Sequence, residues 1–474
     1  MSLPSYLQSL EANITGTQGV GVPTPPAAPP QLPSFLTAPE LSAGLTTSNG
    51  GSTAGKLKFL LVGTHCHQVT GYSKVTYGIV KVLSKLDTVA VTHFGFQRNP
   101  QTASNSRPYP PNIRVLDAAD MERRSLGQQP NQQQQQGFGF NVLPDVIRHE
   151  KPDVVMIYND MAVVSRFLEE IRKSGIPRTF KIWLYVDQVY NTQHQMFLDI
   201  INRDADRVFA FTAYWKKCLK DQGITRPIDV LGHAFETEFF QPTNRKEIRT
   251  KLGLPLDAFI ITSLNRNQPR KRYDILLMAF VELLAKFPNK PVFLMCFCDK
   301  GEKGGWWLFE VFQRELKLRG LPLERFGNRL MLSSTDMNFR DEDINMFYNL
   351  GDIGISTADG EGWGLCNFEQ MGVGVPQVIP DIGGFKEFCT NENSVLVKPK
   401  YRFYQPTAHS VVGGEAEVCD PHDICVGIER YLLDSETLKR HGDAARQTVL
   451  RFTWDKVCES LVKRLKEAHS DKDD

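Results

Sequence analysis

The sequence has no long apolar run and no surplus of charge of either sign. No uninterrupted hydrophobic stretch approaches the roughly 18 residues that a membrane-spanning helix needs, so we expect no transmembrane segment. The 474 residues include 55 Lys and Arg against 54 Asp and Glu, which gives a formal charge of +1. Because nucleic-acid-binding domains are usually strongly basic, nucleic acid is not an expected partner.

The N-terminus lacks the basic region and the long apolar core of a secretory signal. The nine cysteines are odd in number and follow no framework spacing. This usage is typical of reduced intracellular thiols. We therefore expect a cytoplasmic protein.

Nicotinamide and metal chemistry are also disfavoured. The fingerprint Gly-x-Gly-x-x-Gly is absent from the loop 63–71, which follows the first expected strand. His65 and His67 alternate at the start of that loop, a placement more typical of hydrogen-bonded structural histidines than of ligands. Cys296 and Cys298 share one face of an expected strand, but no matching Cys/His pair stands nearby. We expect no metal site.

The length suggests two domains of ordinary size plus extra segments. Residues 1–55 are rich in Pro, Gly, Ser and Thr, and such a segment buries too little apolar surface to offset its ordering entropy. We expect it to be disordered. Strands and helices then alternate, which predicts an α/β fold with Rossmann-like sheets. A polar stretch at about 97–140 holds a Gln-rich tract, which predicts a mobile insertion.

One stretch of the second half combines three local signals. Residues 352–356 have the apolar pattern of a short buried strand, and the Gly-rich turn 359–364 follows. Residues 365–371 can form one or two helical turns. At such a helix start the unpaired amides point outward and the helix dipole adds a partial positive charge. The stretch therefore predicts an anion site.

Glu361 and Glu369 flank this helix start, with residues 362–368 between them. One lies on the turn and the other two helical turns further on, so they can bracket a ligand that lies across the amides. The alternative is a buried strand-turn-helix with incidental acids.

The spacing of the two acids resembles the two-glutamate motif of the retaining, nucleotide-sugar-dependent glycosyltransferases of group 1 (family 4). That motif runs Glu-Gly-Phe-Gly, four residues, Glu-Ala-Met-Ala-x-Gly-x-Pro-Val-Ile. Residues 361–379 read EGWG, four residues, EQMGVGVPQVI. The resemblance implies the GT-B fold, in which two Rossmann-like domains face each other across a deep interdomain cleft. It also implies a hexosyltransferase whose donor, a nucleotide-diphosphate sugar, is a substrate, with no cofactor.

A basic loop strengthens the resemblance. The family has Gly-Arg, four residues, Lys-Gly after the first strand of its second domain, and Arg266 and Lys271 match with that spacing. Arg272 replaces the usual glycine. Two fixed cations at the end of a strand suit a diphosphate, because Arg can bridge two oxygens and Lys is a compact charge. The alternative is a solvated basic loop.

His233 is in register with the histidine of the family's interdomain linker. The resemblance thus implies an acceptor domain at 56–232, a nucleotide-sugar-binding domain at 233–450 and a closing helix at 451–470 that crosses back to the first domain.

Acids follow two expected strands of the first domain. Asp160 and Asp187 lie where ligands gather in doubly wound sheets, yet both could equally be N-caps of the next helix. The family often has a histidine near the position of Asp187, and its first-loop Gly-Gly turn is matched only partly by Gly71.

The resemblance assigns Glu361 to the donor sugar hydroxyls and Glu369 to the ribose. The groups that would neutralise the leaving diphosphate are the side chains of Arg266 and Lys271 and the amides of Gly364, Leu365, Cys366 and Asn367. Ser333 would lie near the base. With these cations and no Asp-x-Asp arrangement beside them, transfer would need no metal.

The acceptor would be a glycan, a lipid or a protein. Two alternatives remain for the activity: an epimerase or phosphorylase on the same fold, or a non-catalytic sugar- or nucleotide-binding scaffold.

Overall fold

The computed structural model describes residues 55–99, 107–125, 137–298, 305–333, 340–405 and 413–473. Residues 1–54 of the segment expected to be disordered, and the Gln-rich tract at 128–136, lie outside this part of the chain.

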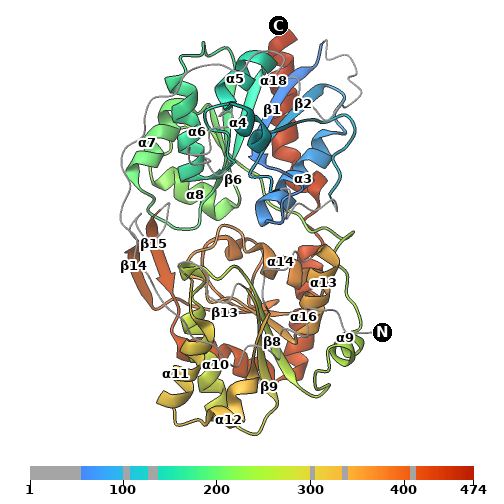
Figure 1. The fold of residues 1–474 in the computed structure, drawn as a ribbon, viewed down its shortest axis with the longest axis vertical. Helices are drawn as coiled ribbons and strands as arrows, with labels where there is room; N and C mark the ends of the chain where they lie inside the picture. The colour runs from blue at the N-terminus through green and yellow to red at the C-terminus, as the bar shows by residue number, and fades with distance from the viewer. Residues whose placement is uncertain are drawn as a thin grey trace.

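The first half forms a parallel seven-stranded sheet in the order β3-β2-β1-β4-β5-β6-β7 (Figure 1). Its strands are β1 (Leu57–Thr64), β2 (Val89–Phe96), β3 (Arg114–Asp117), β4 (Val154–Asp160), β5 (Lys181–Asp187), β6 (Arg207–Ala210) and β7 (Ile228–Val230). Its helices are α3 (Gly71–Leu83), α4 (Ala118–Ser125), α5 (Leu143–Glu150), α6 (Met161–Lys173), α7 (Gln195–Asp204) and α8 (Ala213–Asp221).

The second half forms a parallel six-stranded sheet in the order β10-β9-β8-β11-β12-β13. Its strands are β8 (Phe259–Leu264), β9 (Val292–Phe297), β10 (Leu330–Ser333), β11 (Ile353–Ile355), β12 (Gln377–Pro380) and β13 (Ser394–Val397). Its α-helices are α9 (Arg245–Lys251), α10 (Tyr273–Lys286), α11 (Leu308–Leu318), α12 (Leu323–Phe326), α13 (Asp341–Leu350), α14 (Leu365–Gly372), α15 (Pro421–Leu433) and α16 (Ser435–Val449). The 3-10 turns are η1 (Pro269–Lys271), η2 (Gly327–Arg329) and η3 (Gly383–Glu387).

The central strands are apolar along almost their whole length. β1 and β4 bury nearly every residue, because helices cover both faces of a parallel sheet. In β4 the amide and carboxyl side chains, Asn159 and Asp160, come at the carboxyl end of the strand. The predicted α/β class with two facing Rossmann-like units is confirmed.

The C-terminal helices return to the first domain. α17 (Trp454–Val457) packs against α3, and α18 (Glu459–Asp473) packs against β1, as the red helix among blue elements shows in Figure 1. The Trp454 indole lies so close to Gly78 of α3 that a Cβ there would come within 2.0 Å of the ring. Ser460 Oγ also donates to Val230 O at 2.6 Å. The closing segment thus joins both halves of the chain.

Two features were missed from the sequence. β3 and α4 lie inside the stretch expected to be a mobile insertion. The stretch as a whole is polar, but its residues Val115, Leu116 and Met121 are buried. The antiparallel hairpin of β14 (Tyr401–Gln405) and β15 (Gly414–Val418) extends from the second domain alongside the first.

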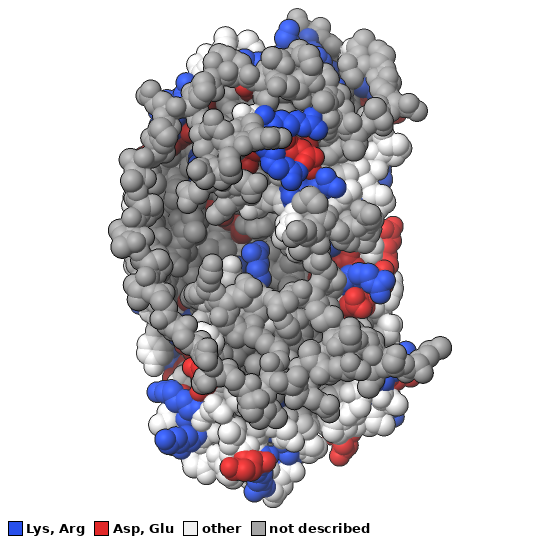
Figure 2. Space-filling model, in the orientation of Figure 1, with Lys and Arg blue, Asp and Glu red and all other residues white. Residues whose placement is uncertain are grey.

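Positive and negative side chains are interspersed over the described part of the face in Figure 2, in keeping with the near-zero formal charge. Within the described ranges, no helix is long and apolar enough to cross a membrane.

Candidate active site

The turn after β11 leads directly into α14. Gly364 has φ +89 and a Cβ on it would lie 2.2 Å from the Phe385 ring, so only glycine fits there. No side chain caps α14, and the first amides of a helix have no intrahelical acceptor. Leu365, Cys366 and Asn367 carry these amides, in the arrangement that the sequence predicts for an anion site.

Glu361 is buried beside two cations. Its Oε2 lies 2.5 Å from Lys271 Nζ and 3.1 Å from Arg270 Nη1. Burial alone would raise the pKa of Glu361, but the two cations outweigh it and hold the pKa below its usual value. The structure therefore brings the predicted residues Glu361 and Lys271 into one ion pair.

Arg270 was missed from the sequence, although it lies in the same basic loop. Its guanidinium also donates to Gly360 O at 3.0 Å. Arg266, which was predicted, is exposed, and its side chain makes no hydrogen bond or ion pair with the described part of the chain. The signal that could have revealed Arg270 is its position next to Lys271.

The backbone conformation of Arg272 shows how arginine can stand where the family has glycine. It adopts the left-handed conformation (φ 49, ψ 49) that glycine usually supplies at this point. Its guanidinium pairs with Asp274 at 2.8 Å, so its charge supports the start of α10.

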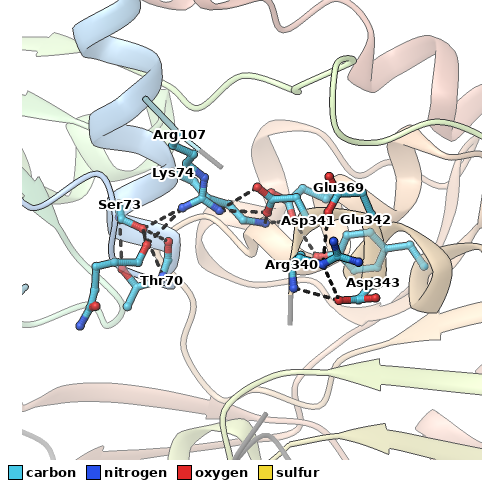
Figure 3. A network of polar contacts seen from close by, with 11 residues as sticks. Thr70, Ser73, Lys74, Arg107, Arg340, Asp341, Glu342, Asp343 and Glu369 are labelled. Carbon is cyan, nitrogen blue, oxygen red and sulfur yellow. Dashed lines mark hydrogen bonds and ion pairs between the residues drawn. The ribbon is translucent and has the colours of Figure 1, made fainter. Parts of the chain in front are cut away.

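Glu369 is buried on α14 and is bound by two other elements. Lys74 Nζ of α3 lies 2.9 Å from both carboxylate oxygens (Figure 3). The Tyr348 hydroxyl of α13 donates to Oε2 at 2.6 Å. Burial raises the pKa of Glu369 in spite of these partners. Neither Lys74 nor Tyr348 was predicted, because no local sequence signal links them to Glu369.

The two candidate acids of the first domain have different roles. Asp160 is the N-cap of α6 and accepts from Val163 N at 2.9 Å. Asp187 caps no helix: its Oδ2 accepts from the Tyr72 hydroxyl at 2.7 Å, and a Cβ on Gly362 would lie 2.0 Å from its Oδ1. Burial raises the pKa of Asp187 to about 6. Asp187 therefore touches the Gly-rich turn 359–364 of the second domain, which carries Glu361 and is called the glutamate turn below.

The remaining predicted residues are more dispersed. Gly71 begins α3, and a Cβ there would meet Leu365 Cδ2 at 3.5 Å, so these two lie together. The Asn367 side chain points away from the helix start and donates to Gln377 at 2.9 Å. Ser333 ends β10 opposite Phe297 of β9.

The histidines pack against other rings, as structural histidines commonly do. The rings of His65 and His67 lie 4.9 Å apart, and burial lowers the pKa of each. His233 is packed between Phe211 and Trp363, and burial lowers its pKa to about 3. Among the residues that the structure describes, no group of three His, Cys, Asp or Glu side chains could hold a metal ion.

No protein-family model matches the chain. It is 24% identical over 230 residues to D-inositol 3-phosphate glycosyltransferase 2 of Catenulispora acidiphila, a match that covers 48% of this chain and 47% of the relative. The chain thus spans about half the length of the curated relatives it matches.

Solved structures match over a longer stretch. Sucrose-phosphate synthase from Thermosynechococcus elongatus aligns with a TM-score of 0.64 at 15% identity, covering 88% of this chain and 100% of that one. Anabaena HepE in complex with UDP and glucose aligns with a TM-score of 0.60 at 17% identity, covering 87% and 100%.

These likenesses place the molecule in the class of two-domain GT-B folds. The matches to curated glycosyltransferases confirm the more specific resemblance, which is to the group 1 enzymes.

Proposed function

We propose that the protein is a retaining hexosyltransferase that moves a sugar from a nucleotide-diphosphate donor to an acceptor held by the first domain. The observation that carries the proposal is the buried pairing of Lys271 with Glu361, beside the uncapped start of α14. Cations and helix-start amides gather there at the boundary between the domains.

In the proposed reaction, the bond between the anomeric carbon and a diphosphate oxygen breaks. The acceptor hydroxyl forms the new bond on the same face of the sugar, and its proton leaves with the diphosphate. Negative charge grows on that diphosphate, so fixed donors aimed at it lower the barrier more than they favour substrate binding. Arg266, Lys271 and the amides from Leu365 onward are the groups assigned to this task.

Glu361 is assigned to the donor sugar hydroxyls and Glu369 to the ribose, with Ser333 near the base. Asp187 faces the sugar from the first domain, in the region where the family often has a histidine. Its contact with Gly362 supports this position. Close packing of the two domains would keep water from the donor.

The names of similar proteins support the choice of donor. HepE was solved with UDP and glucose, and the relative from Catenulispora is named as a glycosyltransferase. A uridine diphosphate sugar is therefore the first donor to test.

The test is a donor panel. The purified chain is incubated with UDP-, GDP- and ADP-hexoses and a mixed set of glycan, lipid and peptide acceptors, and products are followed by mass spectrometry. We expect transfer from one donor with retained anomeric configuration in the NMR spectrum. Binding of a donor without its consumption would favour a scaffold, and epimer formation or phosphate-dependent cleavage without acceptor would favour the other enzymes.

Removal of metal is expected to leave this transfer unchanged. Protein cations are proposed to neutralise the diphosphate, so no divalent ion is required. The measurement is the initial rate with excess EDTA, compared with a rate in added Mg²⁺. A loss of activity that Mg²⁺ restores would contradict metal independence.

A pH effect is expected from Asp187. Because its pKa in the folded protein is about 6 against a usual 3.8, the folded state holds this proton more tightly than the unfolded chain. Stability from this group is therefore greatest below about pH 4, falls as the pH rises to about 6, and is constant above it. Asp187→Asn removes the titration and should stabilise the protein at neutral pH by roughly 3 kcal/mol.

The measurement is the melting temperature of the wild type and Asp187→Asn between about pH 4 and 8. Asp359 also has a pKa raised to about 6 by burial, but it is present in both proteins and cancels in the difference. A difference that does not change with pH would contradict the assignment.

A further inference from the structure

Four charged side chains join the two domains at Glu369. Lys74 and Arg107 belong to the first domain (Figure 3). In the second domain, Asp341 begins α13 and Glu369 lies on α14. Arg107 Nη2 lies 2.9 and 3.1 Å from the two oxygens of Asp341. Lys74 Nζ lies 2.9 Å from both oxygens of Glu369 and 3.8 Å from Asp341 Oδ1. Lys74 is thus shared between two acids.

This cluster is removed from solvent. The side chains of Arg107, Asp341 and Glu369 are 4%, 2% and 4% exposed, and that of Lys74 is 17% exposed. Removing one partner of a buried pair leaves an uncompensated charge, which is strongly unfavourable. Each acid is therefore stabilised by its cationic partner.

The position of the Lys74 ammonium decides what else can bind Glu369. Because it is equidistant from both oxygens, it lies in the plane that passes between them, while Tyr348 takes a further lone pair of Oε2. A vicinal diol that donates one hydrogen bond to each oxygen must also approach between the two oxygens. Ammonium and diol cannot both occupy that space.

We propose that Lys74 is an internal competitor for the ribose-binding carboxylate, so that a nucleotide must displace its ammonium and its affinity is set by this exchange. The inference rests on the proposed function, in which Glu369 holds the ribose. Asp341 offers the displaced ammonium a second partner, since its Oδ1 already lies 3.8 Å away. The exchange therefore needs a side-chain movement and not a separation of the domains.

The test replaces Lys74 by methionine, whose apolar end suits the Phe240 ring that lies 4.6 Å from Lys74 Nζ. UDP, GDP and ADP are titrated into the wild type and the variant by calorimetry. Burial raises the pKa of Glu369, and Lys74 opposes that rise, so the titrations are run at about pH 8 to favour the ionised carboxylate once the lysine is gone. The best-bound nucleotide should bind about tenfold more tightly to Lys74→Met, because the competing state is gone.

Lys81→Met is the matched control. Lys81 lies on the same helix and pairs with Glu236 at 3.0 Å, and it does not touch Glu369. Its removal should leave nucleotide affinity unchanged. Glu369→Gln should weaken binding in both the wild-type and the Lys74→Met background. Lys74→Gln, which keeps a polar end without a charge, gives a second form of the test if Lys74→Met folds poorly.

The outcomes separate the two proposals. Nucleotide binding that depends on Glu369 but is unchanged or weaker in Lys74→Met and Lys74→Gln overturns the competition and leaves the donor site intact. Binding that does not respond to Glu369→Gln overturns the competition as well, because the ribose is then held elsewhere. If none of the three nucleotides binds the wild type or either lysine variant, the proposed function itself is wrong.

Discussion

Replacing Lys271 by methionine is expected to lower the rate of sugar transfer by about 10²- to 10³-fold. Lys271 is the buried cation that lies next to the α14 helix start, and it is assigned to the charge that grows on the leaving diphosphate. A group that acts mainly in the transition state affects kcat more than donor binding. The measurement is kcat and KM for the donor at saturating acceptor.

The fold should survive this change, because Glu361 keeps Arg270 as a partner at 3.1 Å. Lys286→Met is a suitable control, since Lys286 of α10 forms an ion pair with Glu429 at 3.1 Å on the surface of the same domain. A Lys271→Met enzyme with the wild-type kcat would remove Lys271 from the chemistry. A change in KM alone would assign it to donor binding only.

The parts of the site that could be predicted are those fixed by neighbours in sequence. Glu361, Gly364 and the helix start follow from one strand-turn-helix, whose geometry is dictated by a few consecutive residues. Lys271 could be found for a similar reason, since the spacing within its loop is short. Local patterns also sufficed for the alternation of strands and helices that defines the α/β class.

The missed parts depend on contacts between distant segments. Lys74 reaches Glu369 across 295 positions of the chain, and the contact depends on how the two domains pack. Tyr72 and Asp187 meet across 115 positions. The buried residues of β3 are too few to stand out from the polar stretch around them. No periodicity within a single segment carries such information.

The glycines of the glutamate turn show how closely the domains meet, and they give the second large expected effect. A Cβ on Gly362 would lie 2.0 Å from Asp187 Oδ1 and 3.4 Å from Gln188 O. Gly362→Ala must therefore push the turn away from β5, or displace Asp187 from Tyr72. Because an error of about 1 Å in the placement of reacting groups can lower a rate by about 10²-fold, we expect a loss of transfer of this size.

The effect should arise from misplacement and not from unfolding, so it is measured as transfer rate together with the melting temperature. Gly63→Ala is the matched control: Gly63 is buried in β1, and the nearest atoms to a Cβ there belong to the side chains of Thr76 and His93, at 3.4 Å or more. The double variant Gly362→Ala/Asp187→Gly, which removes the carboxylate that the new methyl group meets, should recover the interdomain fit without recovering the role of Asp187.

If Gly362→Ala transfers sugar at the wild-type rate, the turn and Asp187 do not need their close contact during the reaction. In that case the assignment of Asp187 to the donor sugar would lose its structural basis.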